Sequence, residues 1–257
     1  MNTNLNRDEE EVKNIIASDA YSKFNDKQWD DRELQNYLIS ELIKPNKGKP
    51  VIVTLIGAPA SGKSTLVEQL IDQLRKKKYA VDSISTDGFG LYSRRERNER
   101  IAKGAHPLEM KDIALNKQIV AKVRDGKAVK APVYDELTGD AIVAPLENWH
   151  QLPPNLDYLI EEGDLQPIDD PDLKIYLHLP TDVRRENRIK RDLEKRGGYG
   201  DADAIRKSFD DRLETQYYPY TLPNAAKADI LIITETHPES KDNQYHHYYT
   251  YTLYLRK

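Results

Sequence analysis

The chain has 257 residues, with 38% hydrophobic and 32% charged side chains, a composition typical of a globular protein with one substantial core. Its net charge of −4 excludes a general attraction to nucleic acid or to an anionic membrane, so anions would have to bind at local basic clusters and a nucleic-acid partner is not expected. The absence of cysteine excludes disulfides, thiol catalysis and cysteine-based zinc sites. Since the polar N-terminus is not typical of a signal peptide and no apolar run is long enough to span a bilayer, we expect a cytoplasmic protein without a membrane partner.

Residues 1–49 predict a helical extension that precedes the first strand. Two amphipathic patches carry this prediction: Val12, Ile15 and Ile16, and then Leu34, Tyr37, Leu38, Leu42 and Ile43. Asp30 or Asp31 is suited to cap the second helix, which should end at Pro45. The pattern fits a packing appendage as well as a regulatory or oligomerisation segment, and a homo-oligomer is left open.

The stretch GAPASGKST predicts a phosphate-binding P-loop. It follows the β-branched apolar run Val51–Ile56, which is typical of a buried parallel strand, and it leads into an amphipathic helix whose N-terminus favours anions. Lys63 should reach the β and γ phosphates of a nucleotide, and Ser64 should bind Mg²⁺. The residues expected to hold the nucleotide are Gly57, Ala58, Pro59, Ala60, Ser61, Gly62, Lys63, Ser64 and Thr65.

The next predicted strand, Ala80–Ser85, delivers Asp87 to the same edge of a parallel sheet. There a carboxylate could accept a proton from a substrate hydroxyl or help to place Mg²⁺. An Asp before a Gly is also common in ordinary turns, and position alone does not separate the two interpretations.

Three regions further along offer candidate substrate and anion contacts. The charged stretch 93–107 fits either a solvated helix or an anion-binding surface, and Asp112 should open a helix over Ile113–Arg124. Lys127–Ala144 predicts strand, polar loop and strand. Its exposed connection carries Tyr134, Asp135 and Asp140, which could bind substrate hydroxyls or simply form a hairpin.

The strand Tyr158–Ile160 is followed by Glu162, a carboxylate placed as a ligand of Mg²⁺ opposite the P-loop would be. The following strand, Ile175–Leu179, contains His178, for which a packed structural role is favoured over catalysis.

The segment 182–200 predicts a helical lid with a glycine-rich exit. Helical spacing gathers cations on one face, namely Arg184, Arg188, Arg191 and Lys195. These cations could stabilise charge on a transferred phosphoryl group, although interspersed acids also fit a solvated helix with ion pairs. A helix over Ala202–Tyr218, a core strand over Ala228–Ile233 and a tyrosine-rich terminal strand, for which an edge position is one option, complete the chain.

Several ordered motifs resemble the phosphoribulokinase/uridine kinase family of P-loop small-molecule kinases. Besides the P-loop they are STDGF (85–89), KGAHPLEMKD (103–112), PVYD (132–135), EG (162–163) and RIKRDLEKRG (188–197). The chain departs from the family pattern in two places: KGAHPLEMKD has an inserted His and lacks a Phe, and the segment after Asp135 has no histidine.

This resemblance implies roles for individual residues. Asp87 would be the base, Glu162 would act with Ser64 at Mg²⁺, and Arg191 would stabilise the transferred group beside Lys63. Arg188 and Arg196 would bind the ATP phosphates. The substrate would contact Lys103, Tyr134, Asp135 and Asp140.

We therefore expect an α/β P-loop NTPase fold, with three layers and a mostly parallel sheet, a helical extension over 1–49, a kinase domain over 50–257 and a C-terminal strand. The expected activity is transfer of the γ-phosphoryl group of ATP to a hydroxyl of a small metabolite, with Mg²⁺. Two alternatives stay open: a kinase for a nucleotide or a nucleic-acid end, and a nucleotide-dependent switch that binds a protein partner.

Overall fold

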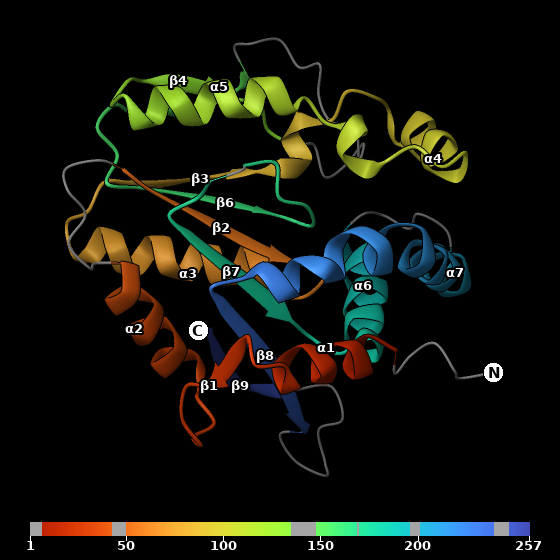
Figure 1. Ribbon diagram of the computed structural model, residues 1–257. Helices are drawn as coiled ribbons and strands as arrows, with labels where there is room; N and C mark the ends of the chain where they lie inside the picture. Colours follow the sequence, from red (N-terminus) through yellow and green to blue (C-terminus); the bar gives the residue numbers. More distant parts are fainter. Residues whose placement is uncertain (1–6, 43–49, 135–147, 169, 196–200, 239–246) are drawn as a thin grey trace.

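The computed structural model describes residues 7–42, 50–134, 148–168, 170–195, 201–238 and 247–257. Seven strands form one twisted sheet in the order β1-β9-β8-β7-β2-β6-β3 (Figure 1). The strands of this sheet are β1 (Tyr21–Lys23), β2 (Val51–Gly57), β3 (Val81–Ser85), β6 (Tyr158–Gly163), β7 (Leu173–His178), β8 (Ile230–Pro238) and β9 (His247–Arg256). Strands β3, β6, β2, β7 and β8 are parallel to one another. Strand β9 pairs antiparallel with β8, and β1 pairs antiparallel with β9. This arrangement confirms the expected mostly parallel α/β fold.

Strand β2 occupies the middle of the parallel part of the sheet. All of its residues are buried, because β6 and β7 flank it and helices cover both faces. A strand in this position has no solvent-facing side, which explains the unbroken apolar run in its sequence. The neighbouring strands β6 and β7 also bring their carboxyl ends next to the loop that follows β2.

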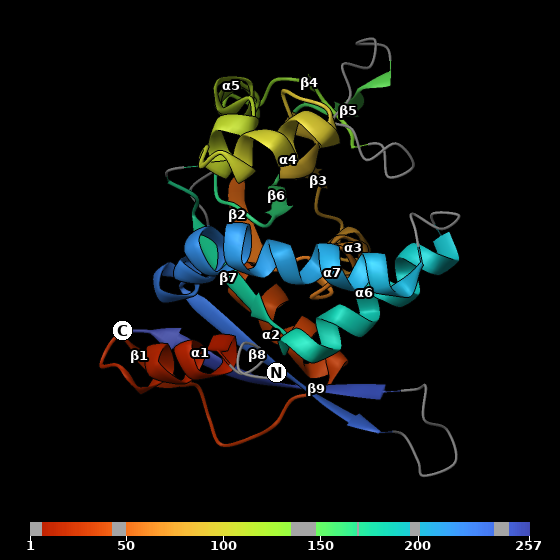
Figure 2. The ribbon, with the colours of Figure 1, turned by 90° about the vertical axis from the view of Figure 1, so that its right-hand side faces the viewer.

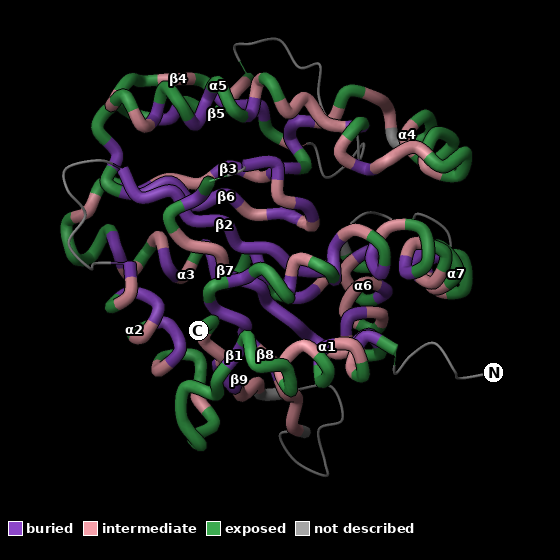
Figure 3. Tube along the Cα trace, in the orientation of Figure 1, coloured by how far each residue is buried: buried purple, intermediate pink, exposed green. Residues whose placement is uncertain are grey.

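Helices pack on both faces of the sheet, so the molecule has three layers (Figures 1 and 3). One face packs on α2 and α3, and the opposite face packs on α5 at one end and on α1 with α7 at the other. A small hairpin of β4 (Val129–Ala131) and β5 (His150–Leu152) lies beside α5. The helices are α1 (Arg7–Ala17), α2 (Asp31–Leu42), α3 (Lys63–Lys76), α4 (Arg94–Ala102), α5 (Ile113–Arg124), α6 (Thr181–Lys195) and α7 (Ala202–Arg212).

One sequence-based expectation about the ends of the chain needs correction. Residues 1–49 do not precede the first strand, because Tyr21–Lys23 form β1, which pairs with β9. Consequently β9 lies inside the sheet and β1 forms its edge (Figure 2). A strand of three residues leaves almost no period-2 signal, and its partner lies at the far end of the chain. The predicted helices of this region are present, and Asp30 caps α2 by accepting a hydrogen bond from the Glu33 N–H at 2.8 Å.

The helix predicted over Ala202–Tyr218 also differs from the structure. Its α-helical part ends at Arg212, and a wider π-helical segment continues over Leu213–Thr221. Pro219 lies in this segment, where its missing N–H and fixed ring are incompatible with regular α-helical bonding. Within the described residues, no helix is both long and apolar enough to cross a membrane.

A fully buried ion pair joins the N-terminal helix to the base of α6. Arg184 donates to Asp8 at 3.0 Å and to the Leu179 carbonyl at 2.8 Å, and its guanidinium lies over the Tyr217 ring. The two charged side chains are 1% and 0% exposed. Arg184 is therefore not one of the lid cations that helical spacing predicted, since Asp8 neutralises it inside the protein.

We predict that Asp8→Asn lowers the free energy of unfolding by about 3–5 kcal/mol, because it leaves the Arg184 charge buried without a counter-ion. Urea titration measures the change. Glu11→Gln on the same helix is the matched control. Glu11 pairs with Arg7 at the surface, so we expect an effect within about 0.5 kcal/mol. Similar effects for the two variants would contradict the prediction.

Candidate active site

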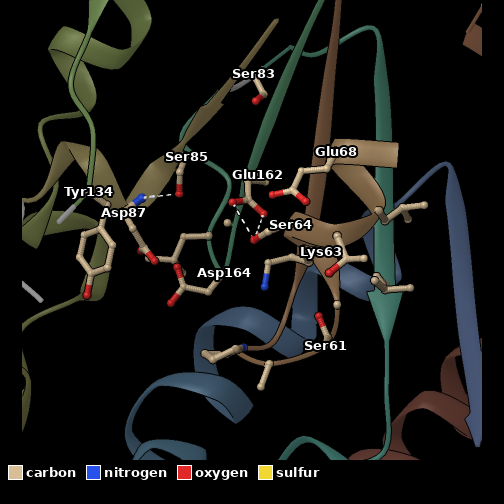
Figure 4. A pocket seen from close by; sticks show the side chains of 18 of the residues that line it. Ser61, Lys63, Ser64, Glu68, Ser83, Ser85, Asp87, Tyr134, Glu162 and Asp164 are labelled. Atoms are coloured by element: carbon tan, nitrogen blue, oxygen red, sulfur yellow. Dashed lines mark hydrogen bonds between the residues drawn. The ribbon is translucent and has the colours of Figure 1, made fainter. Parts of the chain in front are cut away.

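The carboxyl ends of three parallel strands meet at one edge of the sheet. In the register, Glu162 of β6 lies opposite both Leu55 of β2 and Ser85 of β3. The P-loop that follows β2, Asp87 beyond β3 and Glu162 at the end of β6 therefore line one cavity of about 1380 Å³ (Figure 4). Ligands of open parallel sheets bind at this edge.

The P-loop geometry depends on its two glycines. A Cβ on Gly57 would lie 2.5 Å from the Leu177 carbonyl oxygen, so only glycine lets the loop start this close to β7. Gly62 has a φ of 91°, in the left-handed region that favours glycine. The residues from Pro59 to Thr65 line the cavity.

Lys63 lies inside the loop, where its ammonium donates to the Ala58 carbonyl at 2.8 Å. Burial lowers the pKa of Lys63, while the nearby carboxylates Glu162, Asp164 and Asp87 act in the opposite direction. The ammonium is thus a buried cation next to the phosphate-binding backbone.

Ser64 and Glu162 contact each other directly. The Ser64 hydroxyl lies 3.0 and 2.9 Å from the two carboxylate oxygens of Glu162. Burial raises the pKa of Glu162, and Lys63 together with the Ser64 bond counteracts this shift. Two hard oxygen donors beside a phosphate-binding loop are a donor set suited to Mg²⁺, which usually takes its other ligands from phosphates and water.

Asp87 faces the cavity from the 3₁₀ turn Thr86–Phe89, close to Asp164 and Tyr134 (Figure 4). Lys111 contacts it with a nitrogen-to-oxygen distance of 3.0 Å. Burial acts to raise the pKa of Asp87, but Lys111, with Lys63 and Arg97, outweighs it and lowers the pKa to about 2. Asp87 is consequently ionised at neutral pH.

The predicted lid helix is α6, and two of its arginines line the cavity. Arg188 and Arg191 both pair with Asp192, at 2.6 and 3.3 Å. Asp192 is buried, so it holds both guanidinium groups on the cavity side of the helix. Figure 2 shows α6 beside α7, across the P-loop edge of the sheet.

The structure brings some of the other predicted site residues together and not others. Tyr134 is half-buried and lines the cavity. Lys103 is exposed at the end of α4 and is not among the described residues that line the cavity. Asp135, Asp140 and Arg196 lie outside the described residues.

Among the charged residues of the cavity that sequence reasoning missed, Lys111 and Asp164 lie next to Asp87. Signals for both were present. Lys111 stands within KGAHPLEMKD, the motif that lacks the usual Phe, and Asp164 directly follows the Glu162–Gly163 pair. His178, expected to be structural, is buried, and burial lowers its pKa to about 4, so it stays neutral in the core.

Glu161 lies behind the site, on the opposite face of β6 from Glu162. It is 1% exposed and accepts a hydrogen bond from Asn116 of α5 at 2.6 Å. Burial raises the pKa of Glu161 to about 8, although the Asn116 bond and Lys111 lower it. Glu161 therefore keeps its proton at neutral pH.

This protonation predicts a pH-dependent stability. Between pH 4.5 and about 8 the native Glu161 holds a proton that the unfolded chain has lost, so the free energy of unfolding should fall as pH rises. Between pH 5 and pH 8 the free energy of unfolding of the wild-type protein should fall by roughly 2–4 kcal/mol more than that of Glu161→Gln. Urea unfolding at several pH values measures this difference. Parallel pH profiles for the two proteins would show that Glu161 is not protonated in the fold.

The fold and this edge of the sheet define the class of P-loop kinases: a central strand leads into a phosphate-binding loop, an acid follows the next strand, and an arginine-bearing helix lies across from them. The model of the Phosphoribulokinase / Uridine kinase family matches residues 52–239, and the chain belongs to this family.

Individual relatives agree with this membership. The chain is 31% identical over 212 residues to a uridine kinase of Limosilactobacillus reuteri, which covers 79% of this chain and 88% of the relative. A putative fructose transport system kinase from Silicibacter has a similar structure, with a TM-score of 0.55 and 25% identity. The match covers 74% of this chain and 91% of that kinase. Phosphoribulokinase from Rhodobacter spheroides shares the fold with a TM-score of 0.53 and 17% identity, over 78% and 75% of the two chains. The chain is thus an ATP-dependent small-molecule kinase, and the alternative of a regulatory switch is not favoured.

Proposed function

We propose that the chain transfers the γ-phosphoryl group of ATP to a hydroxyl group of a small metabolite, and that Asp87 binds the reacting hydroxyl. The observation that carries this proposal is the position of the ionised Asp87 on the cavity that the P-loop and Lys63 also line. A carboxylate that faces a phosphate-binding loop can hold a hydroxyl in line with the terminal phosphate.

In this mechanism the P-loop N–H groups and Lys63 hold the phosphates of ATP. The hydroxyl oxygen attacks the γ-phosphorus, the bond from phosphorus to the β–γ bridging oxygen breaks, and ADP leaves. Negative charge spreads over the transferred group in the transition state, and Arg188 and Arg191, with the predicted Arg196, stabilise it. Asp192 orients the first two arginines.

The low pKa of Asp87 bears on how it acts. A carboxylate with a pKa of about 2 is a weak base, so it accepts a hydrogen bond from the hydroxyl and takes the proton only as the new oxygen–phosphorus bond forms. Phosphoryl transfer through a loose transition state needs little deprotonation before attack. Asp87 therefore serves mainly to orient the acceptor.

Ser64 and Glu162 are the residues that would hold Mg²⁺, since their oxygens form a compact hard donor set next to the P-loop. When bound, the ion neutralises charge on the β and γ phosphates.

Several further assignments belong to this proposal. The L. reuteri relative is a uridine kinase, so uridine is one acceptor to test. Tyr134, Asp135 and Asp140 remain proposed substrate contacts, whereas the proposal for Lys103, which does not line the cavity, rests on its family motif alone. We also propose the division into an extension over 1–49 and a kinase domain over 50–257 with a lid over 182–200, and a location in the cytoplasm, where ATP is available.

We predict that Asp87→Asn lowers kcat by about 10²–10⁴-fold, because the amide cannot accept the proton of the hydroxyl. ATP affinity, measured by calorimetry, should stay within about threefold, since Asp87 does not belong to the P-loop. Asp125→Asn, at an exposed position after α5, is the control and should leave both quantities unchanged. Undiminished turnover by the Asp87 variant would eliminate the proposed role.

We further predict that Glu162→Gln raises the Mg²⁺ concentration for half-maximal activity by about 10–100-fold, because the neutral amide is a poorer partner for the cation and for the Ser64 hydroxyl. A Mg²⁺ titration at saturating ATP measures this shift. Excess Mg²⁺ should restore much of the activity, whereas Glu99→Gln, on the exposed face of α4, should behave like wild type. An unchanged Mg²⁺ requirement would place the metal elsewhere.

A further inference from the structure

Three charged side chains form a compact array at the acceptor side of the cavity. The Lys111 ammonium lies 3.0 Å from the Asp87 carboxylate and 3.9 Å from the Asp164 carboxylate. It also donates to the Thr86 carbonyl at 3.0 Å. Lys111 is only 11% exposed, and all three charged residues line the cavity.

The backbone holds this array in a fixed arrangement. The segments on either side of Lys111 bond to the segment that carries Asp87: the Leu91 N–H donates to the Met110 carbonyl at 2.9 Å, and the Asp112 N–H donates to the Phe89 carbonyl at 2.7 Å. Asp164 comes from the loop directly after β6, which pairs with β3. A site whose charged groups are positioned by main-chain bonds is preorganised for a ligand of matching geometry.

The array leaves hydrogen-bonding capacity between Lys111 and Asp164. An ammonium has three donors, and Lys111 uses two of them on Asp87 and Thr86. Its distance of 3.9 Å to Asp164 is too long for a hydrogen bond. The Asp164 Oδ1 atom is itself buried and has no hydrogen-bond partner among the described residues, a situation that is rare for a buried carboxylate oxygen.

A hydroxyl group would satisfy the hydrogen-bonding requirements of both of these groups. It can accept a hydrogen bond from the ammonium and donate one to the carboxylate at the same time. We propose that the acceptor is a polyhydroxylated carbon chain, a sugar or sugar alcohol, whose reacting hydroxyl binds Asp87 while the neighbouring hydroxyl bridges Lys111 and Asp164. This inference rests on the proposed kinase activity and names its substrate class.

The charges around the array favour such a neutral acceptor. Two carboxylates flank one ammonium, and Arg97 of α4 and Lys63 of the P-loop add positive charge close to Asp87, so the array carries both signs of charge. A carboxylate or phosphate next to the reacting hydroxyl would face Asp164 at short range and be repelled. A nucleobase, by contrast, binds best between apolar or aromatic walls. Tyr134 could provide one such wall, so nucleosides belong in the test.

The first experiment uses the purified full chain with ATP and Mg²⁺ and measures ADP release together with the mass of the product. The polyol acceptors are fructose, ribose, ribitol and glycerol, and each is compared with an analogue that lacks the hydroxyl next to the reacting one. The competing acceptors are the nucleosides uridine and cytidine and the anion glycerate. We expect kcat/KM to be highest for one of the sugars or sugar alcohols. The kcat/KM for its deoxy analogue should be lower by at least about 100-fold, because the buried partners of the missing hydroxyl are then left unpaired.

The second experiment repeats the comparison in Asp164→Asn and Lys111→Met. Each variant should reduce kcat/KM for the full polyol by about 100-fold while the KM for ATP stays within about twofold. In the Asp164 variant the polyol and its deoxy analogue should become nearly equal, because the group that distinguishes them has been altered. Substitution of a residue with a merely structural role would lower kcat/KM for both substrates by the same factor. Lys122→Met and Asp125→Asn, both at exposed positions, are the matched controls.

The outcomes separate the two proposals. Preference for uridine, cytidine or glycerate over every sugar and sugar alcohol would overturn the polyol inference and leave the kinase proposal standing. Equal decreases in kcat/KM for the polyol and its deoxy analogue in the Asp164 variant would also overturn the polyol inference and leave the kinase proposal standing. Product formation from no acceptor, despite measurable ATP binding, would overturn the proposed function and this inference with it.

Discussion

Burial of β2 between two parallel neighbours is the constraint on which the rest of the structure depends. Because β6 and β7 bond to both of its edges and helices cover both faces, the position of this strand is fixed, and the P-loop begins where it ends. The same parallel register sets Glu162 next to the loop and delivers Asp87 from β3 to the same edge. A phosphate-binding loop and the groups that could act on a bound phosphate thus come together through main-chain hydrogen bonding.

Charge pairing organises the cavity above this edge. Lys63 faces three carboxylates, Lys111 contacts Asp87, and Asp192 holds two lid arginines. Isolated charges would be costly in such a partly buried space, and these four cations, Lys63, Lys111, Arg188 and Arg191, each have an acid nearby. These pairings keep Asp87 ionised and the arginines directed towards the cavity.

Much of the fold could be predicted because its signals are local. The apolar run before the P-loop, the cap at Asp112 and the amphipathic helices all depend on neighbours a few residues apart. The strand β1 could not be predicted, since three residues carry little periodicity and the partner strand is β9 at the other end of the chain. In the site, the positions of Asp87 and Glu162 on the cavity were foreseen. Lys111 and Asp164 were not, although one lies inside a motif and the other next to one, because the sequence does not show which charged side chains lie beside Asp87.

The sequence by itself determined the chemistry of the phosphate side, because a P-loop needs a particular run of glycines, a lysine and a serine that are consecutive in the chain. It also determined the family, through motifs that follow one another in order. Only the tertiary structure decided which cations serve the cavity: Arg184 is buried against Asp8 in the core, while Lys111 comes to lie beside Asp87. The physical reason is that the electrostatic role of a side chain depends on the charges and the burial around it, and these come from segments far apart in the sequence.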